Sequence, residues 1–151
     1  MTATMVRAAD STNDWWENVC GDVGRRTRRR LRSLGAEYVY MPDSVIVAEG
    51  SRADRFSLII HGEVEVIVDG EVVNTLGSGD FFGEVALLYS RPVGPEQAPV
   101  ALPRTATVRA SKTTRVHELD RAELMTMMDA APAAASRISR RAIGRLAVLK
   151  T

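Results

Sequence analysis

Two short groups of residues, twenty positions apart, have the side chains needed to bind a sugar phosphate. Gly83-Glu84 precedes the apolar run 85–88, and Arg104-Thr105 precedes a run of β character. A helix N-terminus presents unpaired N–H groups, and a glycine there lets a phosphate approach the backbone. An arginine binds two phosphate oxygens, and a glutamate accepts hydrogen bonds from a ribose hydroxyl. Together the two groups indicate a nucleotide site.

Short strands must position these residues. Five runs of β character are bounded by Gly, Asp or Pro: residues 38–40, 44–47, 55–60, 63–68 and 71–76. The runs 105–110 and 114–119, with Ser111-Lys112-Thr113 between them, complete the set. Asp69-Gly70 lies between two of them and predicts a hairpin turn with positive φ angles. Many short strands at this spacing predict a mainly β fold, a jelly-roll barrel with N-terminal helices and two C-terminal helices.

The chain divides into four parts. We expect a disordered tail at 1–13, a helical segment at 14–34 in which two tryptophans dock on the body of the domain, and C-terminal helices at 121–151. The jelly-roll core is expected at 35–120, with a proline-rich insertion at 91–102. A length of 151 residues suits one such domain with its own core.

The C-terminal helices carry start signals and one apolar stripe. Asp120 and Glu123 form a predicted capping box, and Pro132 suits the first turn of the next helix. The stripe comprises Ile138, Ala142, Leu146 and Leu149. It requires a partner, which is the barrel, a second copy of the helix, or the exposed base of a ligand.

The same stretches resemble a known family. FGEVALL at 82–88 followed by PRTATVRA at 103–110 is similar to the phosphate-binding cassette of the cyclic nucleotide-binding domain family. Residues 41–66 and 76–82 resemble its strand and turn signatures, and the similarity extends over roughly residues 31–149. Both halves of the cassette occur in order, which makes the signal specific.

The resemblance implies a cyclic nucleotide as ligand, with cyclic AMP expected before cyclic GMP. It implies that Glu84 holds the ribose 2′-OH, that Arg104 holds the phosphate, and that Thr105 contacts phosphate or base. The expected ligand-binding residues are Phe82, Gly83, Glu84, Val85, Ala86, Arg104, Thr105 and Ala106. No aromatic residue follows Tyr89, so the expected cap on the base is aliphatic, from Ile143, Leu146 or Leu149.

The spacing of the cassette departs from the family pattern. Glu84 and Arg104 are twenty positions apart, much farther than in most members, and the excess is the insertion 91–102 with its three prolines. Prolines reduce the entropy that a loop loses on ordering. The insertion is therefore interpreted as a flap beside the cassette, and Arg91 within it is an alternative phosphate ligand.

Two other interpretations remain. In a domain used only for interaction, Glu84 and Arg104 would form an internal ion pair and bind no nucleotide. A metal-dependent jelly-roll enzyme of the cupin type needs several histidines, whereas the chain has only His61 and His117. We expect His61 in a turn and His117 at a surface or strand edge. The expectation is a non-catalytic sensor without metal or cofactor.

Composition places the chain among cytoplasmic globular proteins. It is 45% hydrophobic and 26% charged, has one cysteine, and lacks an apolar run of membrane-spanning length or a signal peptide. The net charge of +1 is uneven: +3 over residues 1–34, −6 over 35–120 and +4 over 121–151. An anion bound in the acidic middle segment therefore needs local donors such as Arg104.

Six arginines lie in the predicted helix 24–34. They suit either an anionic partner or a solvated helix face, and the near-neutral chain with few aromatics favours the second. Expected partners are thus a cyclic nucleotide, a second copy through helix 133–149 or an attached effector domain, with no direct nucleic-acid contact and no membrane insertion. Since the chain ends at Thr151, we expect a stand-alone sensor or one module of a larger regulated protein.

Overall fold

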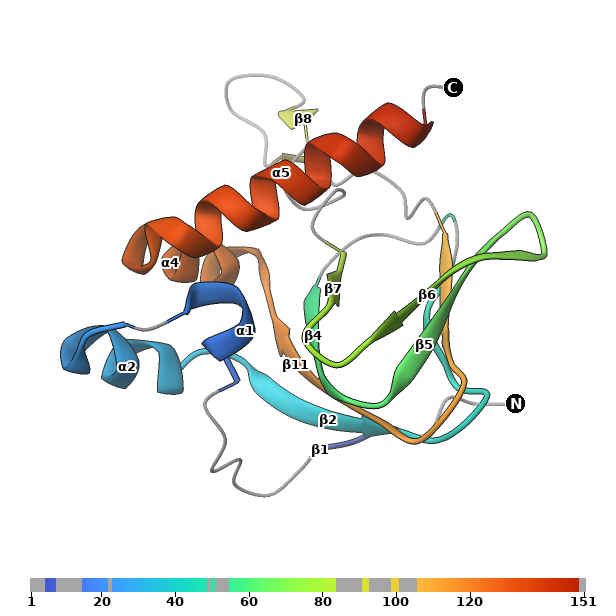
Figure 1. The fold of residues 1–151 in the computed structure, drawn as a ribbon, viewed down its shortest axis with the longest axis horizontal. Coiled ribbons are helices and arrows are strands. Elements are labelled where there is room, and N and C mark those ends of the chain that lie inside the picture. The colour runs from blue at the N-terminus through green and yellow to red at the C-terminus, as the bar shows by residue number, and fades with distance from the viewer. Residues whose placement is uncertain are drawn as a thin grey trace.

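Two antiparallel β-sheets face each other in the computed structural model (Figure 1). The structure describes residues 5–7, 15–21, 23–48, 50, 55–83, 91–92, 99–100 and 106–149; for 5–7, 18, 91–92, 99–100 and 142–149 it describes the backbone alone. The first sheet has the order β1 (Met5–Arg7), β2 (Ala36–Tyr40), β11 (Thr114–Leu119), β4 (Phe56–His61) and β7 (Phe81–Phe82). The second has the order β3 (Val45–Val47), β10 (Thr107–Ala110), β5 (Glu63–Val68) and β6 (Glu71–Gly77).

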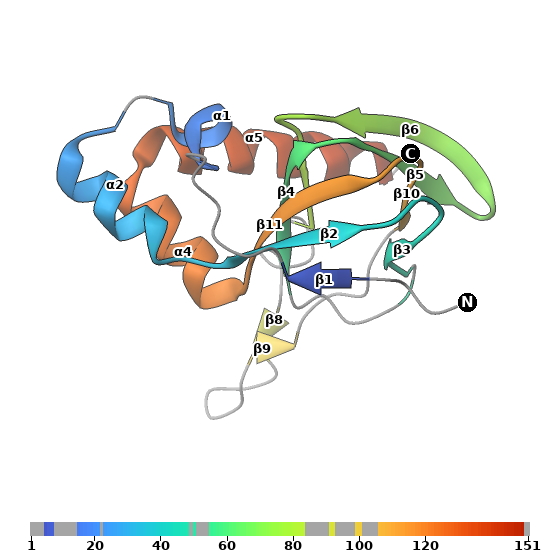
Figure 2. The same ribbon diagram turned by 90° about the horizontal axis from the view of Figure 1, so that it is seen from below.

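The chain passes repeatedly from one sheet to the other. Strands β2, β4, β7 and β11 belong to the first sheet, and β3, β5, β6 and β10 between them belong to the second. This alternation is what a jelly roll requires, and it confirms the predicted fold class. A third, two-stranded sheet pairs β8 (Arg91–Pro92) with β9 (Pro99–Val100) in the proline-rich insertion, and Figure 2 shows it standing outside the two larger sheets.

Strand β4 is buried on both of its faces. Phe56 and Leu58 belong to a core cluster formed with the helices, whereas Ile59 belongs to the cluster between the two sheets. Side chains alternate along a strand, so one strand serves both cores. The predicted hairpin turn after β5 is present, with φ angles of 52° at Asp69 and 80° at Gly70.

Four described helices cover the first sheet and one end of the molecule: α1 (Glu17–Cys20), α2 (Arg25–Arg32), α4 (Arg121–Ala130) and α5 (Pro132–Leu149). The predicted capping box starts α4, since Asp120 accepts from Glu123 N at 2.8 Å and Glu123 accepts from Asp120 N at 3.1 Å. None of the described helices is both long enough and apolar enough to cross a membrane.

The N-terminal tryptophans complete the helical core, as expected. Trp15 and Trp16 are 5% and 1% exposed and pack with Leu31 of α2, Leu124 of α4 and Ile138 of α5. Because Ile138 lies in this core, the described part of the α5 stripe packs within the same domain. Figure 1 shows α1, α2 and α4 at the end of the molecule opposite the β5–β6 hairpin.

Candidate functional site

The two halves of the expected cassette lie on the connection between the two sheets. The chain leaves the first sheet at Phe82 of β7 and enters the second at Thr107 of β10. Gly83 follows β7 with a φ of 93°, a conformation that favours glycine. Ala106 is half-buried directly before β10. Glycine and alanine thus stand at the two ends of this connection, where small residues were expected.

Other predicted site residues lie outside the described residues. They are Glu84, Val85, Ala86, Arg104 and Thr105. The expected cap residues Ile143, Leu146 and Leu149 lie on the C-terminal half of α5, whose side chains are also outside the description. Their roles therefore stay predictions, as does the alternative ion pair between Glu84 and Arg104. Of the insertion, the described part is the strand pair β8–β9.

Strand β7 fixes the start of the cassette. It pairs with β4, placing Phe82 opposite Ser57 and Phe81 opposite Leu58. Phe82 is 4% exposed within the cluster between the sheets, whereas Phe81 faces the helices, with its ring 5.4 Å from that of Phe56. The cassette therefore begins at a short strand that has one side chain packed in each of the two cores.

The turn before β7 is held by hydrogen bonds and touches α5. Asp80 accepts a hydrogen bond from Gly77 N at 2.9 Å, as expected of a turn residue, and its carbonyl accepts from Ile59 N at 2.8 Å. From α5, Arg141 Nη2 lies 3.9 Å from Asp80 Oδ1, and its guanidinium lies 5.8 Å from the centre of the Phe81 ring. Helix α5 thus contacts the chain two and three residues before Gly83.

A buried polar cluster occupies one end of the space between the sheets. Glu118 on β11 is 6% exposed, and its carboxylate accepts hydrogen bonds from Tyr40 Oη at 2.8 Å and Arg55 Nη1 at 2.9 Å. Ser57 Oγ lies 3.5 Å from the same carboxylate. Burial, and then the neighbouring Glu118 charge, raise the pKa of Tyr40, so its hydroxyl stays protonated and donates. The cluster satisfies a carboxylate that burial would otherwise destabilise.

The polar cluster borders a pocket of about 260 Å³ between the ends of β2, β4 and β11 and the start of α4. Its lining comprises Gly35, Ala36, Tyr38, Arg55, Glu118, Leu119, Asp120 and Glu123. None of the described cassette residues, Phe82, Gly83 and Ala106, lines it. Its carboxylates already serve as partners of Arg55 and of backbone N–H groups, so this pocket is a structural feature of the sheet end.

The hydrogen bond from Tyr40 can be tested by removing one oxygen. Tyr40→Phe should lower the free energy of unfolding by about 1.5–3 kcal/mol, since a bond to a buried charged group is lost. Tyr38→Phe is the matched control, because its half-buried ring lies against Arg55 at 5.6 Å and would remain. Urea unfolding of both variants measures the difference. Equal effects of the two changes would show that the Tyr40–Glu118 bond contributes nothing of its own.

His117 lies in the interior, so the prediction of a surface or edge position was wrong. It is 5% exposed on β11, which lies between β2 and β4, and its Nε2 lies 2.7 Å from the carbonyl oxygen of Leu34. The ring of Trp15 stacks on it with centroids 4.1 Å apart. The N-terminal segment covers this face of the sheet and buries a histidine that sequence alternation placed outside.

Burial gives His117 a testable effect on stability. Desolvation lowers the pKa of His117 below its usual 6.5, although the Leu34 carbonyl and the Glu123 charge oppose the shift. The unfolded chain therefore binds a proton at a higher pH than the folded chain does. Above pH 6.5 the neutral His117 does not lower the free energy of unfolding. That free energy falls as the pH drops below 6.5 toward the pKa of His117 in the folded chain.

Urea unfolding between pH 7.5 and pH 5 should reveal this loss. Replacing His117 with glutamine, which can still donate to Leu34, should flatten the profile between pH 6.5 and pH 5. His61→Gln is the matched control, because it makes the same side-chain replacement at an exposed position at the end of β4. An unaltered slope in the His117 variant would contradict the assignment.

Metal ligands do not gather in the described part of the chain. No group of three or more His, Cys, Asp or Glu side chains there has the geometry to hold a metal ion. His61 lies exposed at a strand end and His117 is buried against Trp15, so the two histidines do not share a site. The cupin-type interpretation therefore gains no support from these residues.

Comparison with known proteins gives a consistent answer. The family model described as "Cyclic nucleotide-binding domain" matches residues 37–131, more than half of the chain. A cAMP-dependent protein kinase regulatory subunit from Yarrowia lipolytica is 38% identical over 103 residues, which cover 67% of this chain and 24% of that protein. A cGMP-dependent protein kinase from Toxoplasma gondii is 45% identical over 53 residues, covering 35% of this chain and 5% of that protein. The chain thus spans a quarter or less of these relatives.

Solved structures share the fold. A cyclic nucleotide-binding domain from Methylobacillus flagellatus covers 97% of this chain with a TM-score of 0.69 at 22% identity, and 89% of that structure is covered. The N-terminal domain of a transcriptional regulator from Streptomyces coelicolor covers 91%, with a TM-score of 0.60 at 20% identity and 94% of that structure covered. The family match includes the residues from β2 to the C-terminal end of α4, with both halves of the cassette between them. The chain belongs to the cyclic nucleotide-binding domain family.

Proposed function

We propose that this chain binds a 3′,5′-cyclic nucleotide, cyclic AMP before cyclic GMP, and acts as a regulatory sensor without catalytic activity. The observation that carries the proposal is the family match, which runs through Gly83-Glu84 and Arg104-Thr105 in one continuous segment. The positive φ of Gly83, directly before Glu84, supports it, because that conformation opens the backbone toward a ligand. No metal or cofactor takes part in binding.

The proposed ligand contacts follow from the chemistry of the cassette. Glu84 accepts hydrogen bonds from the ribose 2′-OH. The cyclic phosphate is held by the guanidinium group of Arg104 and by the backbone N–H groups that follow Gly83, at Val85 and Ala86. Thr105 donates to the phosphate or the base. The base is covered by an aliphatic side chain of α5, and the insertion 91–102 lies beside the cassette as a flap.

Ligand binding is proposed to act on the C-terminal helices. Arg141 of α5 contacts Asp80 and Phe81, immediately before the cassette, so a shift of the cassette changes a contact of α5. Helix α5 in turn packs on α1 and α4 in the helical core. A ligand that favours one arrangement of this contact shifts the population of helix positions. The effector that reads this change is a further part of a larger protein or a separate partner in the cytoplasm.

The buried position of Ile138 limits how residues 133–149 could form a homodimer. Ile138, the member of the stripe whose side chain the structure describes, packs into the core of its own domain, which supports the intramolecular alternative for that part of α5. A dimer, if formed through this helix, would use its C-terminal half. Sedimentation of the chain with and without ligand distinguishes the two arrangements.

Competition against a fluorescent cyclic AMP analogue tests the ligand class. Cyclic AMP should displace the analogue at the lowest concentration and cyclic GMP within about tenfold of it, because one hydrogen bond from Thr105 contributes about 0.5–1.5 kcal/mol. The linear 5′-AMP should compete at least about 100-fold more weakly, since its dianionic phosphate and free 3′-OH do not fit contacts arranged for a cyclic monoanion. Equal competition by 5′-AMP would indicate a general nucleotide site and contradict the proposal.

A further inference from the structure

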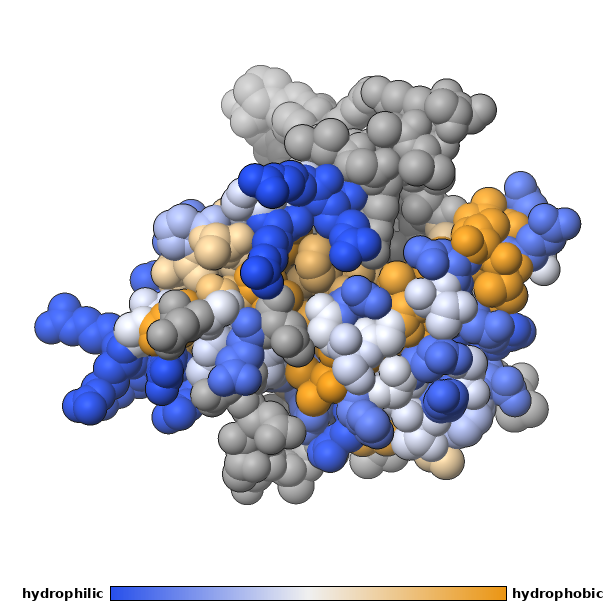
Figure 3. All heavy atoms as spheres, in the orientation of Figure 1, coloured by the Kyte–Doolittle hydropathy of each residue, from blue (hydrophilic) through white to orange (hydrophobic). Residues whose placement is uncertain are grey.

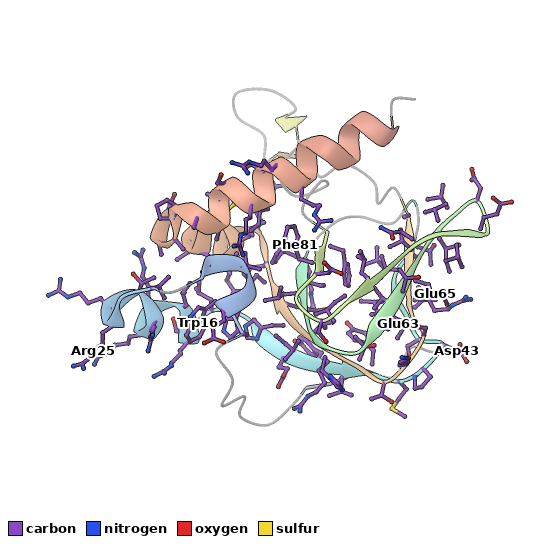
Figure 4. All side chains as sticks on the ribbon, in the orientation of Figure 1. Trp16, Arg25, Asp43, Glu63, Glu65 and Phe81 are labelled. Carbon is purple, nitrogen blue, oxygen red and sulfur yellow. The ribbon has the colours of Figure 1, made fainter. Side chains whose placement is uncertain are left out.

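We propose that the exposed face of α2 is a binding surface for duplex nucleic acid. Six of the eight residues in Arg25–Arg32 are arginines, and all six are exposed. Figure 4 shows the side chain of Arg25 pointing away from the body of the molecule, and Figure 3 shows hydrophilic side chains projecting from this end. The sequence alone favoured a solvated face whose stems cover apolar surface. Arg32 fits that interpretation, since its guanidinium lies 6.0 Å from the centre of the Trp16 ring, whereas Arg25 extends outward.

The arginines form one continuous arc around the helix. Leu31 is fully buried and Thr27 is half-buried, so these two residues mark the side that packs on the domain. At 100° per residue, the six arginines occupy an arc of about 200° on the opposite side of the axis. The helix is about 12 Å long, and this whole outward half presents guanidinium groups.

Within the described part of the chain, four of the six arginines form no ion pair with a carboxylate. These four are Arg25, Arg26, Arg29 and Arg30. The arginines of the barrel differ, since those at positions 55, 109 and 115 each pair with a glutamate. Like charges this close repel each other, so an anionic partner would relieve a cost that the domain otherwise bears.

The width of the arc selects the type of anionic partner. A flat lipid surface touches only one side of a helix, and α2 has no large exposed apolar side chain to insert into it. A duplex groove encloses a helix and places phosphates on both sides of it, which matches an arc of about 200°. Arginine is also the residue best suited to phosphate geometry. The arrangement therefore favours a duplex over a membrane.

The charge distribution sets the orientation of the complex. Helix α2 lies at one end of the molecule, and the β5–β6 hairpin with Asp69 and Glu71 lies at the other (Figure 1). The segment 35–120 that contains the barrel carries a net charge of −6, and residues 1–34 carry +3. With α2 toward the phosphates, the acidic barrel points away from them. The contacts would be mainly to phosphates and independent of sequence.

Fluorescence anisotropy with a labelled 20-base-pair DNA tests the proposal without any cyclic nucleotide. We expect a Kd of about 1–10 µM at 50 mM salt and a slope of log K against log salt near −4, for four to five phosphate contacts. The double variant Arg25→Gln/Arg29→Gln removes the centre of the arc. It should weaken binding at least about tenfold and reduce the slope by about two, whereas Arg25→Lys/Arg29→Lys should keep the slope.

The matched control removes the same charge elsewhere. Lys112→Gln/Arg140→Gln replaces two exposed basic residues, on the barrel side and on α5, and should change the affinity less than about twofold. Equal losses in the two glutamine doubles would mean that only total charge matters and would overturn the proposal. It would also be overturned by no binding to the duplex at 50 mM salt, or by binding to vesicles of anionic lipid without binding to the duplex. Neither result would bear on the cyclic-nucleotide site.

Discussion

Replacing Arg104 with alanine should weaken cyclic AMP binding by at least about 10- to 150-fold. Among the eight expected ligand-binding residues, Arg104 is the one with a permanent positive charge. A charge-assisted bond of this kind is worth about 1.5–3 kcal/mol, and each 1.4 kcal/mol changes affinity about tenfold. The acidic segment around the cassette would then repel the ligand without a local counter-charge. Titration calorimetry of both proteins measures the loss.

Arg91 provides the matched control for this prediction. It is the other arginine between Glu84 and the start of β10, and it lies on β8 in the insertion. Arg91→Ala removes the same charge but should change the affinity less than about threefold, since in the proposed site the phosphate is held by Arg104. If the Arg91 variant lost binding and the Arg104 variant kept it, the phosphate contact would belong to the insertion.

Replacing Gly62 with alanine should destabilise the fold by about 2–4 kcal/mol. Gly62 joins β4 to β5 with a φ of 121°, where a side chain is strained. An added Cβ would lie 2.7 Å from Thr114 Cα and 2.8 Å from Thr113 O, so backbone atoms of the turn between β10 and β11 would have to move. Urea unfolding measures the change, and the unfolding midpoint should fall with little change in the m-value.

Gly70→Ala separates the backbone strain of a positive φ from the overlap of the added Cβ with neighbouring atoms. Gly70 also has a positive φ, of 80°, but nothing lies within 4 Å of its added Cβ. This variant should therefore show only the backbone strain, about 1 kcal/mol or a little more. A Gly62 variant no less stable than the Gly70 variant would show that the turn between β10 and β11 moves at little cost around Thr114.

Local signals in the sequence determined much of the fold. The run 63–68 was predicted as a strand with its observed bounds, and the Asp69-Gly70 turn and the Asp120–Glu123 capping box are both present. Each of these depends on residues fewer than six positions apart, where backbone preference and hydrogen bonding act directly. The family resemblance added the cassette and its ligand class, which local patterns do not contain.

Long-range neighbours were not predictable in the same way. His117 appeared exposed because its strand alternates, but Leu34, 83 residues earlier, brings a carbonyl group to its Nε2. No sequence signal marked Glu118 as buried, although its carboxylate accepts a hydrogen bond from Tyr40, 78 positions earlier in the chain. A charged residue within a strand usually faces solvent. Only the pairing of β11 with β2 and β4 reveals what covers each face.

The predicted ligand contacts rest on the family resemblance and on the chemistry of the side chains. Of the predicted contact residues, the structure describes Phe82, Gly83 and Ala106, which stand at the two ends of the connection between the sheets. The roles of Glu84, Arg104 and Thr105 remain predictions, because a side chain's reach to a ligand depends on the loop conformation between the sheets. Their residue types predict a sugar phosphate as ligand, and the family match supports the proposal of a cyclic nucleotide.

Isothermal titration of the chain with cyclic AMP, and then with cyclic GMP, tests the central proposal most directly. We predict one site per chain with a micromolar Kd for cyclic AMP, a weaker Kd for cyclic GMP, and loss of both in Arg104→Ala. Absence of heat with either nucleotide, at two temperatures and in a sample that unfolds cooperatively, would contradict it. Glu84 and Arg104 would then be an internal ion pair in a domain that keeps the fold without the ligand.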